Sequence, residues 1–351
     1  MGTSSNIQIG LNGVLASIGG VADDVDAEAP ATPNVLCVRS DEGLSSLPYG
    51  PFDPARHRTF EIGLRDWVER QTRVRLGFVE QLYTFGDKGR EAPAASIVGG
   101  APDGRVVSVG YLALAADPAL DATGPTSPAA SAAWRDWYAF FPWEDWRHGE
   151  PRLLAEAVLP GLAAWADRAP QGESSGRRDR IALAFGFAKN GWEEERALDR
   201  YELMYEAGLV EEAWRDRDRA GLAPPRSDRA VSTITGATMA SDHRRILATA
   251  VGRLRGKLKY RAIIFELLPT RFTLLALQRA VEAIVGYDLH KQNFRRAVEA
   301  SGLVDKTEET ARRASGRPAA LFTASDAAYA DRAARGLAIP RLRRAPNYAW
   351  R

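Results

Sequence analysis

The chain has 351 residues, of which 45% are hydrophobic and 26% charged, a composition typical of globular proteins and not of disordered chains. At this length about two domains are expected. The single cysteine, Cys37, excludes an intramolecular disulfide and a multi-cysteine zinc site. No run of residues approaches the ~18 consecutive apolar positions that span a bilayer. We therefore expect a cytoplasmic protein without membrane contact.

The net charge of +2 is the sum of two opposed parts. Residues 243–351 hold 22 Lys or Arg against 9 Asp or Glu, whereas the preceding residues hold 25 basic and 36 acidic side chains. Such asymmetry favours a basic, nucleic-acid-facing C-terminal domain attached to an acidic partner domain. The alternative is a solvated basic surface with no ligand.

The first part of the chain shows mixed strand and helix patterns. Apolar and β-branched runs predict strands, and apolar residues at helical spacing after Thr59, a suitable N-cap, predict a helix. The expected elements are a strand or hairpin at 7–21, strands at 35–38, 78–85 and 106–114, and a helix at 59–71.

Residues 134–146 form an aromatic cluster that we interpret as core or interface, with a ligand wall as the alternative. Helical periodicity then dominates residues 148–216, interrupted by a Gly/Ser/Arg-rich loop at 171–179. The polar segment 221–242 contains two consecutive prolines and is predicted to be a linker or surface loop.

The C-terminal part predicts a helix-turn-helix. An amphipathic helix opens it at His243, and Thr273 begins a further helix that Gly286 ends. The second helix of the helix-turn-helix begins at about His290 and buries Phe294 and Val298.

The second helix turns polar and basic groups away from its buried side, which makes it a candidate recognition helix. A polar, arginine-containing run and an apolar strand at 320–323 then resemble a wing. The alternative is a helical hairpin that only packs on the first domain. The candidate DNA-binding residues are Lys291, Gln292, Asn293, Arg295 and Arg296 on the helix, and Arg312, Arg313 and Arg317 on the wing.

The sequence resembles the NrtR-type, Nudix-related transcriptional regulators of NAD metabolism. The matching segments in the C-terminal part are Leu254-Arg-Gly-Lys-Leu-Lys-Tyr260, Phe265-Glu-Leu-Leu-Pro269, Phe272-Thr-Leu274, Leu277-Gln278, Asn293-Phe-Arg-Arg296 and Gly316-Arg-Pro318. Those in the first part are Glu80-Gln-Leu-Tyr-Thr-Phe-Gly-Asp87, Val107-Ser-Val-Gly-Tyr111 and Phe141-Pro142. Together they cover about half of the chain, and residues 148–229 have no counterpart that we recognise in the compact family members.

The resemblance implies an α+β protein in which a Nudix-like α/β/α sandwich with a helical insertion precedes a winged helix-turn-helix. We expect the Nudix-like domain at 1–147, the insertion and linker at 148–242, the winged helix at 243–325 and a basic tail at 326–351. The resemblance also implies a homodimer that binds double-stranded operator DNA and responds to an NAD-related nucleotide such as ADP-ribose. Four aromatic residues are candidates for stacking on the adenine, although each is equally suited to a core: Tyr83, Phe85, Phe141 and Trp143.

The Nudix motif decides whether this domain hydrolyses its ligand, because several glutamates on one helix face must hold a divalent metal there. Placing Arg73 at the last glycine of the motif puts Arg58, Trp67, Arg70 and Gln71 at the four glutamate positions. Sliding the motif by one residue recovers Arg65 and Glu69 and puts Asp66 at one glutamate position, but leaves His57 and Arg70 at the other two. We therefore expect no enzymatic activity and no resident metal or cofactor.

Two other functions stay open from the sequence. One is a diverged Nudix hydrolase of nucleoside diphosphate compounds that also binds DNA. The other is an interaction protein whose helical segment docks a partner and whose basic domain binds RNA or nothing specific.

Overall fold

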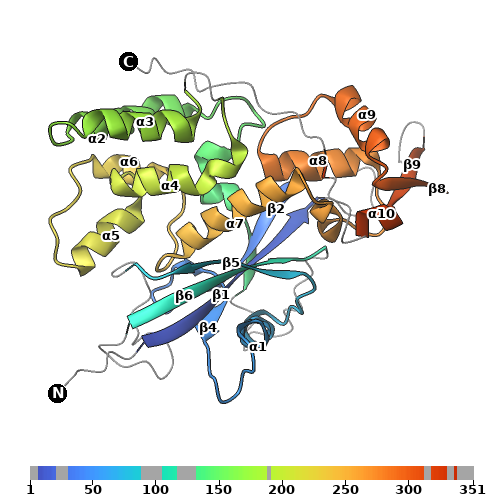
Figure 1. Ribbon diagram of the computed structural model, residues 1–351, viewed down its shortest axis with the longest axis horizontal. Coiled ribbons are helices and arrows are strands. Elements are labelled where there is room, and N and C mark those ends of the chain that lie inside the picture. The colour runs from blue at the N-terminus through green and yellow to red at the C-terminus, as the bar shows by residue number, and fades with distance from the viewer. Residues whose placement is uncertain are drawn as a thin grey trace.

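The computed structural model describes residues 7–20, 31–87, 105–116, 132–187, 191–311, 318–329 and 336–337. A twisted sheet lies below a layer of helices, a helical group lies to one side, and a small helix and strand unit lies at the other end (Figure 1). Within these residues no helix has the length and apolar character needed to cross a membrane.

The sheet has the strand order β3-β2-β1-β6-β5, with β4 also paired to β1 and β7 to β2. Strands β1 and β6 run parallel over the register Ile7↔Arg105 to Ala16↔Leu114, and the other pairs are antiparallel. The strands are β1 (Ile7–Gly19), β2 (Thr32–Arg39), β3 (Ser45–Ser46), β4 (Tyr49–Pro51), β5 (Val79–Phe85), β6 (Arg105–Leu114) and β7 (Ala133–Asp136). The predicted strands of the first part are thus confirmed.

Alternate residues of β1 serve two separate cores, because successive side chains of a strand point to opposite faces. Leu11 and Leu15 belong to the core under α1 (Phe60–Thr72). Val14 and Ile18 belong to the larger core beneath α7 (His243–Leu258) and α8 (Leu274–Val285). The sheet is therefore covered on both faces, as expected for an α/β/α sandwich.

Helix α1 begins and ends as its sequence predicts. The Thr59 hydroxyl accepts a hydrogen bond from the Ile62 amide at 3.2 Å, which satisfies one of the free N–H groups of the first turn. At the other end Arg73 adopts the left-handed conformation, with φ of 62°, and its amide donates to the Glu69 carbonyl.

The helical insertion is more ordered than its sequence suggests. Its helices are η5 (Leu154–Val158), α2 (Leu159–Asp167), α3 (Ser174–Phe185), η6 (Glu194–Arg196), α4 (Ala197–Glu206), α5 (Glu211–Arg219) and α6 (Arg229–Ile234). The predicted loop at 171–179 was wrong in its second half, since α3 starts at Ser174. The predicted linker at 221–242 contains α6 and is held to α5, because Arg215 donates to the carbonyls of Met239 and Ser241 at 2.7 and 2.6 Å.

Residues 263–329 form the small unit at the right of Figure 1. Its elements are η7 (Ile263–Leu267), α8, α9 (Lys291–Ser301), β8 (Val304–Ala311), β9 (Ala319–Ala324) and α10 (Asp326–Tyr329). Helix α7, which we expected to open this unit, packs on two parts of the chain. It lies against β1, β5, β6 and α4 and also against η7 and α8, so the boundary before His243 stays a prediction.

The basic residues of α7 and of the segment after it form ion pairs with earlier parts of the chain. Residues 243–263 hold seven Lys or Arg and no acidic residue. Six of these cations form ion pairs, all with carboxylates that precede His243 in the chain: Arg244 with Glu212, Arg245 with Asp87 and Glu202, Arg253 and Lys257 with Glu80, Arg255 with Glu144, and Lys259 with Glu194 and Glu195. Six of the 22 basic residues of 243–351 are therefore paired inside the chain and do not form a surface that faces nucleic acid.

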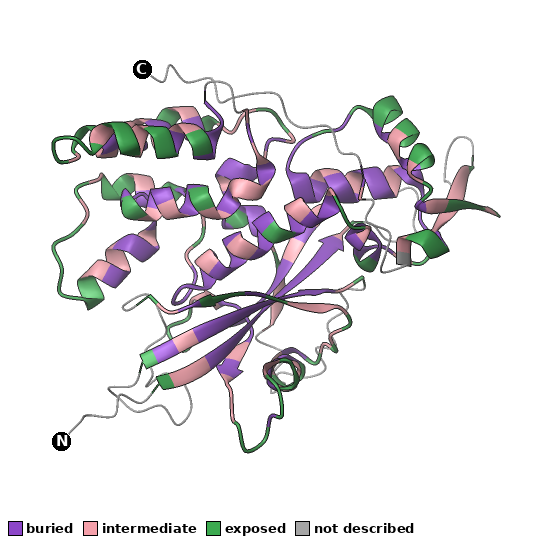
Figure 2. Ribbon diagram, viewed as in Figure 1, coloured by how far each residue is buried: buried purple, intermediate pink, exposed green. Residues whose placement is uncertain are grey.

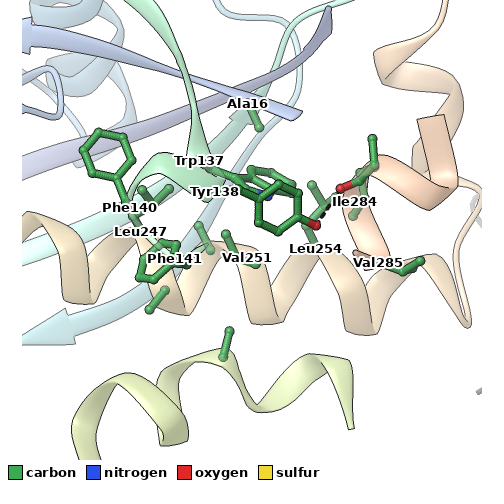
Figure 3. Packing of buried hydrophobic residues seen from close by; sticks show 14 of the residues in the cluster. Ala16, Trp137, Tyr138, Phe140, Phe141, Leu247, Val251, Leu254, Ile284 and Val285 are labelled. Atoms are coloured by element: carbon green, nitrogen blue, oxygen red, sulfur yellow. Dashed lines mark hydrogen bonds between the residues drawn. The ribbon is translucent and has the colours of Figure 1, made fainter. Parts of the chain in front are cut away.

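Two of these pairs are fully buried, Arg244 with Glu212 and Arg255 with Glu144, and the second lies where three parts of the chain meet. Glu144, in the aromatic segment 134–146, is 1% exposed and accepts from fully buried Arg200 of α4 and Arg255 of α7, both at 2.5 Å. The aromatic rings of the same segment pack on α7, and the Tyr138 hydroxyl points toward the end of α8 (Figure 3). The segment is thus core, the first of the two alternatives that its sequence left open.

We predict that Glu144→Gln lowers the free energy of unfolding by about 3–5 kcal/mol, because it leaves two buried guanidinium groups without their counter-charge. Chemical denaturation followed by circular dichroism measures the change. The control is Glu42→Gln, which removes a half-exposed pair with Arg219 and should cost less than about 1 kcal/mol. Equal losses in the two variants would contradict a special role for Glu144.

Candidate functional site

Two helices and a turn at the C-terminal end have the helix-turn-helix arrangement. The Thr273 hydroxyl accepts from the Ala276 amide at 3.1 Å at the start of α8, and Gly286 ends the helix with φ of 86°. A side chain at Gly286 would also place its Cβ 2.4 Å from the Glu144 carbonyl oxygen, so this position needs glycine for two reasons. After the turn, α9 packs through Phe294 and Val298.

The outer face of α9 carries all the candidate helix residues. Lys291, Gln292, Asn293, Arg295 and Arg296 are exposed, and this face is open to solvent (Figure 2). The Arg296 guanidinium donates to the Asn293 side-chain oxygen at 2.7 Å. This contact occupies the Asn293 side-chain oxygen, and the amide nitrogen stays a hydrogen-bond donor on the exposed face.

A two-stranded wing follows α9. Strands β8 and β9 pair antiparallel, and Phe272 adds a backbone bridge to Phe322 through hydrogen bonds of 3.0 and 2.9 Å. Arg271 and Glu309 form an ion pair that ties β8 to the start of α8. The wing arginines Arg312, Arg313 and Arg317 lie outside the described residues, so their role as phosphate contacts stays a prediction.

The exposed groups of α9 suit the major groove of DNA. Guanidinium and amide groups there can pair with base edges, and basic groups can hold phosphates. Residues 264–324 carry nine Lys or Arg against seven Asp or Glu, so the unit as a whole is only slightly basic. Its positive charge is concentrated on α9, which has three cations and one carboxylate.

The four candidate effector residues do not form one exposed wall. Tyr83 is 63% exposed on β5, whereas Phe85 is buried beside it with the two ring centroids 5.4 Å apart. Phe141 and Trp143 are fully buried and enclose the Arg244 guanidinium, 5.7 and 5.3 Å from their ring centroids. In this structure Phe141 and Trp143 are core, and Tyr83 alone among the four is accessible.

The geometry of α1 favours the first placement of the Nudix motif. That placement puts Arg73 at the terminal glycine, and Arg73 has the positive φ that this position requires. It also puts fully buried Val68 at an apolar position of the motif. The four glutamate positions are then Arg58, Trp67, Arg70 and Gln71.

Two of these four residues, Trp67 and Gln71, join α1 to β4, and Arg70 contacts residues of α1 itself. The Gln71 side chain accepts from the Tyr49 amide at 3.0 Å and donates to the Tyr49 carbonyl at 2.8 Å. The Trp67 indole donates to the Pro51 carbonyl at 2.8 Å, and Arg70 lies 5.5 Å from the centroid of the Trp67 ring. Strand β4 thus occupies the side of α1 where a metal would lie, and no cluster of three or more metal-ligating side chains occurs in the described ranges.

Sequence reasoning missed the contacts that attach α8 to the sheet domain. The Tyr138 hydroxyl donates to the Ala283 carbonyl at 2.7 Å, Arg255 donates to the Ile284 carbonyl at 2.8 Å, and the Trp146 amide donates to the Gly286 carbonyl at 2.6 Å. Two of these carbonyls lie in the last turn of α8, and the third belongs to Gly286, which ends the helix. The sequence contains one signal for these contacts, which is that Tyr138 and Glu144 place hydrogen-bonding groups inside the aromatic segment.

Comparisons with known proteins agree with this arrangement. Residues 264–324 match the family model of the NrtR DNA-binding winged helix domain. The chain is 40% identical over 84 residues to the ADPR responsive transcriptional repressor NtrR of Acinetobacter baylyi, an alignment covering 24% of this chain and 33% of that protein. It thus spans about a third of the length of this curated relative.

Two solved structures share the fold at low sequence identity. The crystal structure of Shewanella oneidensis NrtR superposes with a TM-score of 0.50 and 19% identity, covering 94% of this chain and 99% of that one. The same protein complexed with a 27mer DNA gives a TM-score of 0.50 and 19% identity, covering 95% and 99%.

We predict that alanine changes DNA affinity in different ways at base-reading and at phosphate-binding positions. Asn293→Ala should cost about 1–3 kcal/mol on the specific duplex and little on random DNA, because a lost base contact removes discrimination. Arg312→Ala on the wing should weaken both duplexes alike and lower the salt slope by about one unit. Binding of both variants across a salt series measures this. The placement of the recognition helix is wrong if alanine at each of the five α9 positions reduces affinity equally on both duplexes, or not at all.

Proposed function

We propose that this chain, an NrtR-type protein in which a Nudix-like domain precedes a C-terminal winged helix, is a transcriptional repressor of NAD biosynthesis or salvage genes. One observation carries the proposal. The segment that matches the winged helix family presents five polar or basic side chains on the outer face of α9, where none of them contributes to the core. This is the arrangement that a recognition helix needs.

The proposed effector is ADP-ribose or a related NAD-derived nucleotide, bound by the Nudix-like domain in the cytoplasm. The name of the Acinetobacter relative describes an ADPR responsive repressor. Within this chain, the three hydrogen bonds from Tyr138, Trp146 and Arg255 to the end of α8 supply a route for the response. A rearrangement of the sheet domain that moves these donors would move α8 with them, and α9 follows α8 by a five-residue turn.

DNA binding is proposed to need a homodimer, because one recognition helix contacts only a short half-site and two-fold symmetric operators match two-fold symmetric proteins. We expect two chains per duplex, and ADP-ribose should change the operator affinity by about tenfold, a coupling of roughly 1.4 kcal/mol. Light scattering of the complex measures the number of chains per duplex. Fluorescence anisotropy with and without ADP-ribose measures the operator affinity. One chain per duplex would refute the dimer, and an unchanged affinity would refute ADP-ribose as effector.

The Nudix-like domain is proposed to bind without hydrolysis, since the glutamate positions hold Arg58, Trp67, Arg70 and Gln71. We predict no release of AMP from ADP-ribose in the presence of Mg²⁺ or Mn²⁺. Chromatography of the nucleotides after overnight incubation checks this, and Glu69→Gln is the control for a contaminating hydrolase. AMP release by the wild-type protein that Glu69→Gln abolishes would instead support the diverged hydrolase.

A further inference from the structure

The helical insertion contains a cavity of its own, separate from both the sheet domain and the winged helix. It has a volume of about 550 Å³ and lies between α2, α3, α4, α5 and the segment 222–226. This volume falls within the range of about 300–1,000 Å³ that small-molecule sites occupy. The insertion therefore has room for a ligand as well as a packing role.

Four arginines and two aromatic rings line the cavity: Arg168, Arg177, Arg217, Arg226, Trp165 and Tyr205. The apolar side chains of Leu222, Pro224 and Pro225 form part of the remaining wall. The lining thus combines positive charge with flat apolar surfaces.

Two carboxylates also reach the wall, but each is already paired. Glu206 binds Arg180 through both of its oxygens, at 2.5 and 2.8 Å. Asp216 accepts from Arg215 at 2.8 Å and from the Tyr205 hydroxyl at 3.0 Å. Neither Arg180 nor Arg215 lines the cavity, so these two acids are neutralised from outside and do not cancel the charge of the lining arginines.

Two of the four arginines donate to backbone carbonyls, and the other two are exposed. Arg177 lies 4.3 Å from the centroid of the Trp165 ring and donates to the Trp165 carbonyl at 3.0 Å, with a weaker pair to Glu173 at 3.6 Å. Arg217 donates to the Ala223 carbonyl at 2.6 Å. Arg168 and Arg226 are exposed, and neither has a carboxylate partner in the part of the chain that the structure describes.

We propose that this cavity binds a small phosphate ester with an apolar or aromatic body, of about mononucleotide size. Guanidinium groups match phosphate oxygens in charge and in geometry, and they bind them with paired hydrogen bonds. The rings of Trp165 and Tyr205 and the two prolines accept the apolar body. This site lies outside the Nudix-like domain, so it adds a second ligand to the proposed repressor.

Isothermal titration with AMP, and separately with inorganic pyrophosphate, tests the proposal on the full chain. We expect AMP to bind the wild-type protein and the double variant Arg168→Ala/Arg226→Ala to bind it about tenfold more weakly, because two charge-assisted contacts are lost. Arg219→Ala is the matched control, since Arg219 lies on α5, pairs with Glu42 and is not part of the lining. Trp165→Leu should weaken AMP binding and leave pyrophosphate binding unchanged.

Three results would overturn the proposal. Equal AMP affinity in the wild-type protein and the double variant would show that the cavity does not hold the phosphate. Loss of affinity for random duplex DNA in the double variant, without an effect on AMP, would make these arginines a DNA contact. Loss of all ADP-ribose binding in the double variant would make the cavity the effector site itself, and not a second one.

Discussion

Buried charge at one junction organises this molecule. Burial acts to raise the pKa of Glu144, but the Arg200 and Arg255 guanidinium groups outweigh burial and hold the pKa below its ordinary value. The carboxylate therefore stays ionised in a place where an unpaired charge would cost several kcal/mol. Because its partners come from α4 and α7, the aromatic segment, the insertion and the sheet-covering helix must fold together to satisfy it.

The position of the DNA-binding surface follows from the same junction. Arg255 binds Glu144 and also the Ile284 carbonyl in the last turn of α8. The candidate recognition helix α9 itself has only Phe294 and Val298 buried, so its orientation depends on α8 and the wing and not on contacts with the sheet. A proposed signal from the Nudix-like domain thus has a short path: it must alter the donors around Glu144, and the helix-turn-helix follows.

Features set by neighbouring residues could be predicted from the sequence, and features set by distant partners could not. The caps Thr59 and Thr273 and the glycine stop at Gly286 depend on local hydrogen bonds and backbone angles, and all three are confirmed. Charge counting was misleading because composition does not distinguish a paired cation from a free one, and six cations of residues 243–263 pair inside the chain. Aromatic residues pose the same problem, since the sequence cannot say that Phe141 is covered and Tyr83 is not.

Helix α1 keeps the packing of a Nudix-like sandwich with other residues at the glutamate positions of the motif. Leu64 and Val68 keep the buried face that packs on the sheet, so the demands of the fold are met by residues that never touched a metal. On the neighbouring face, Gln71 and Trp67 hold β4, and a side chain at Gly50 would meet the Trp67 ring at 2.2 Å. Restoring glutamates at these positions would remove the contacts that hold β4 and place like charges side by side. Under the proposed function, loss of hydrolysis is therefore built into the packing, and single substitutions do not reverse it.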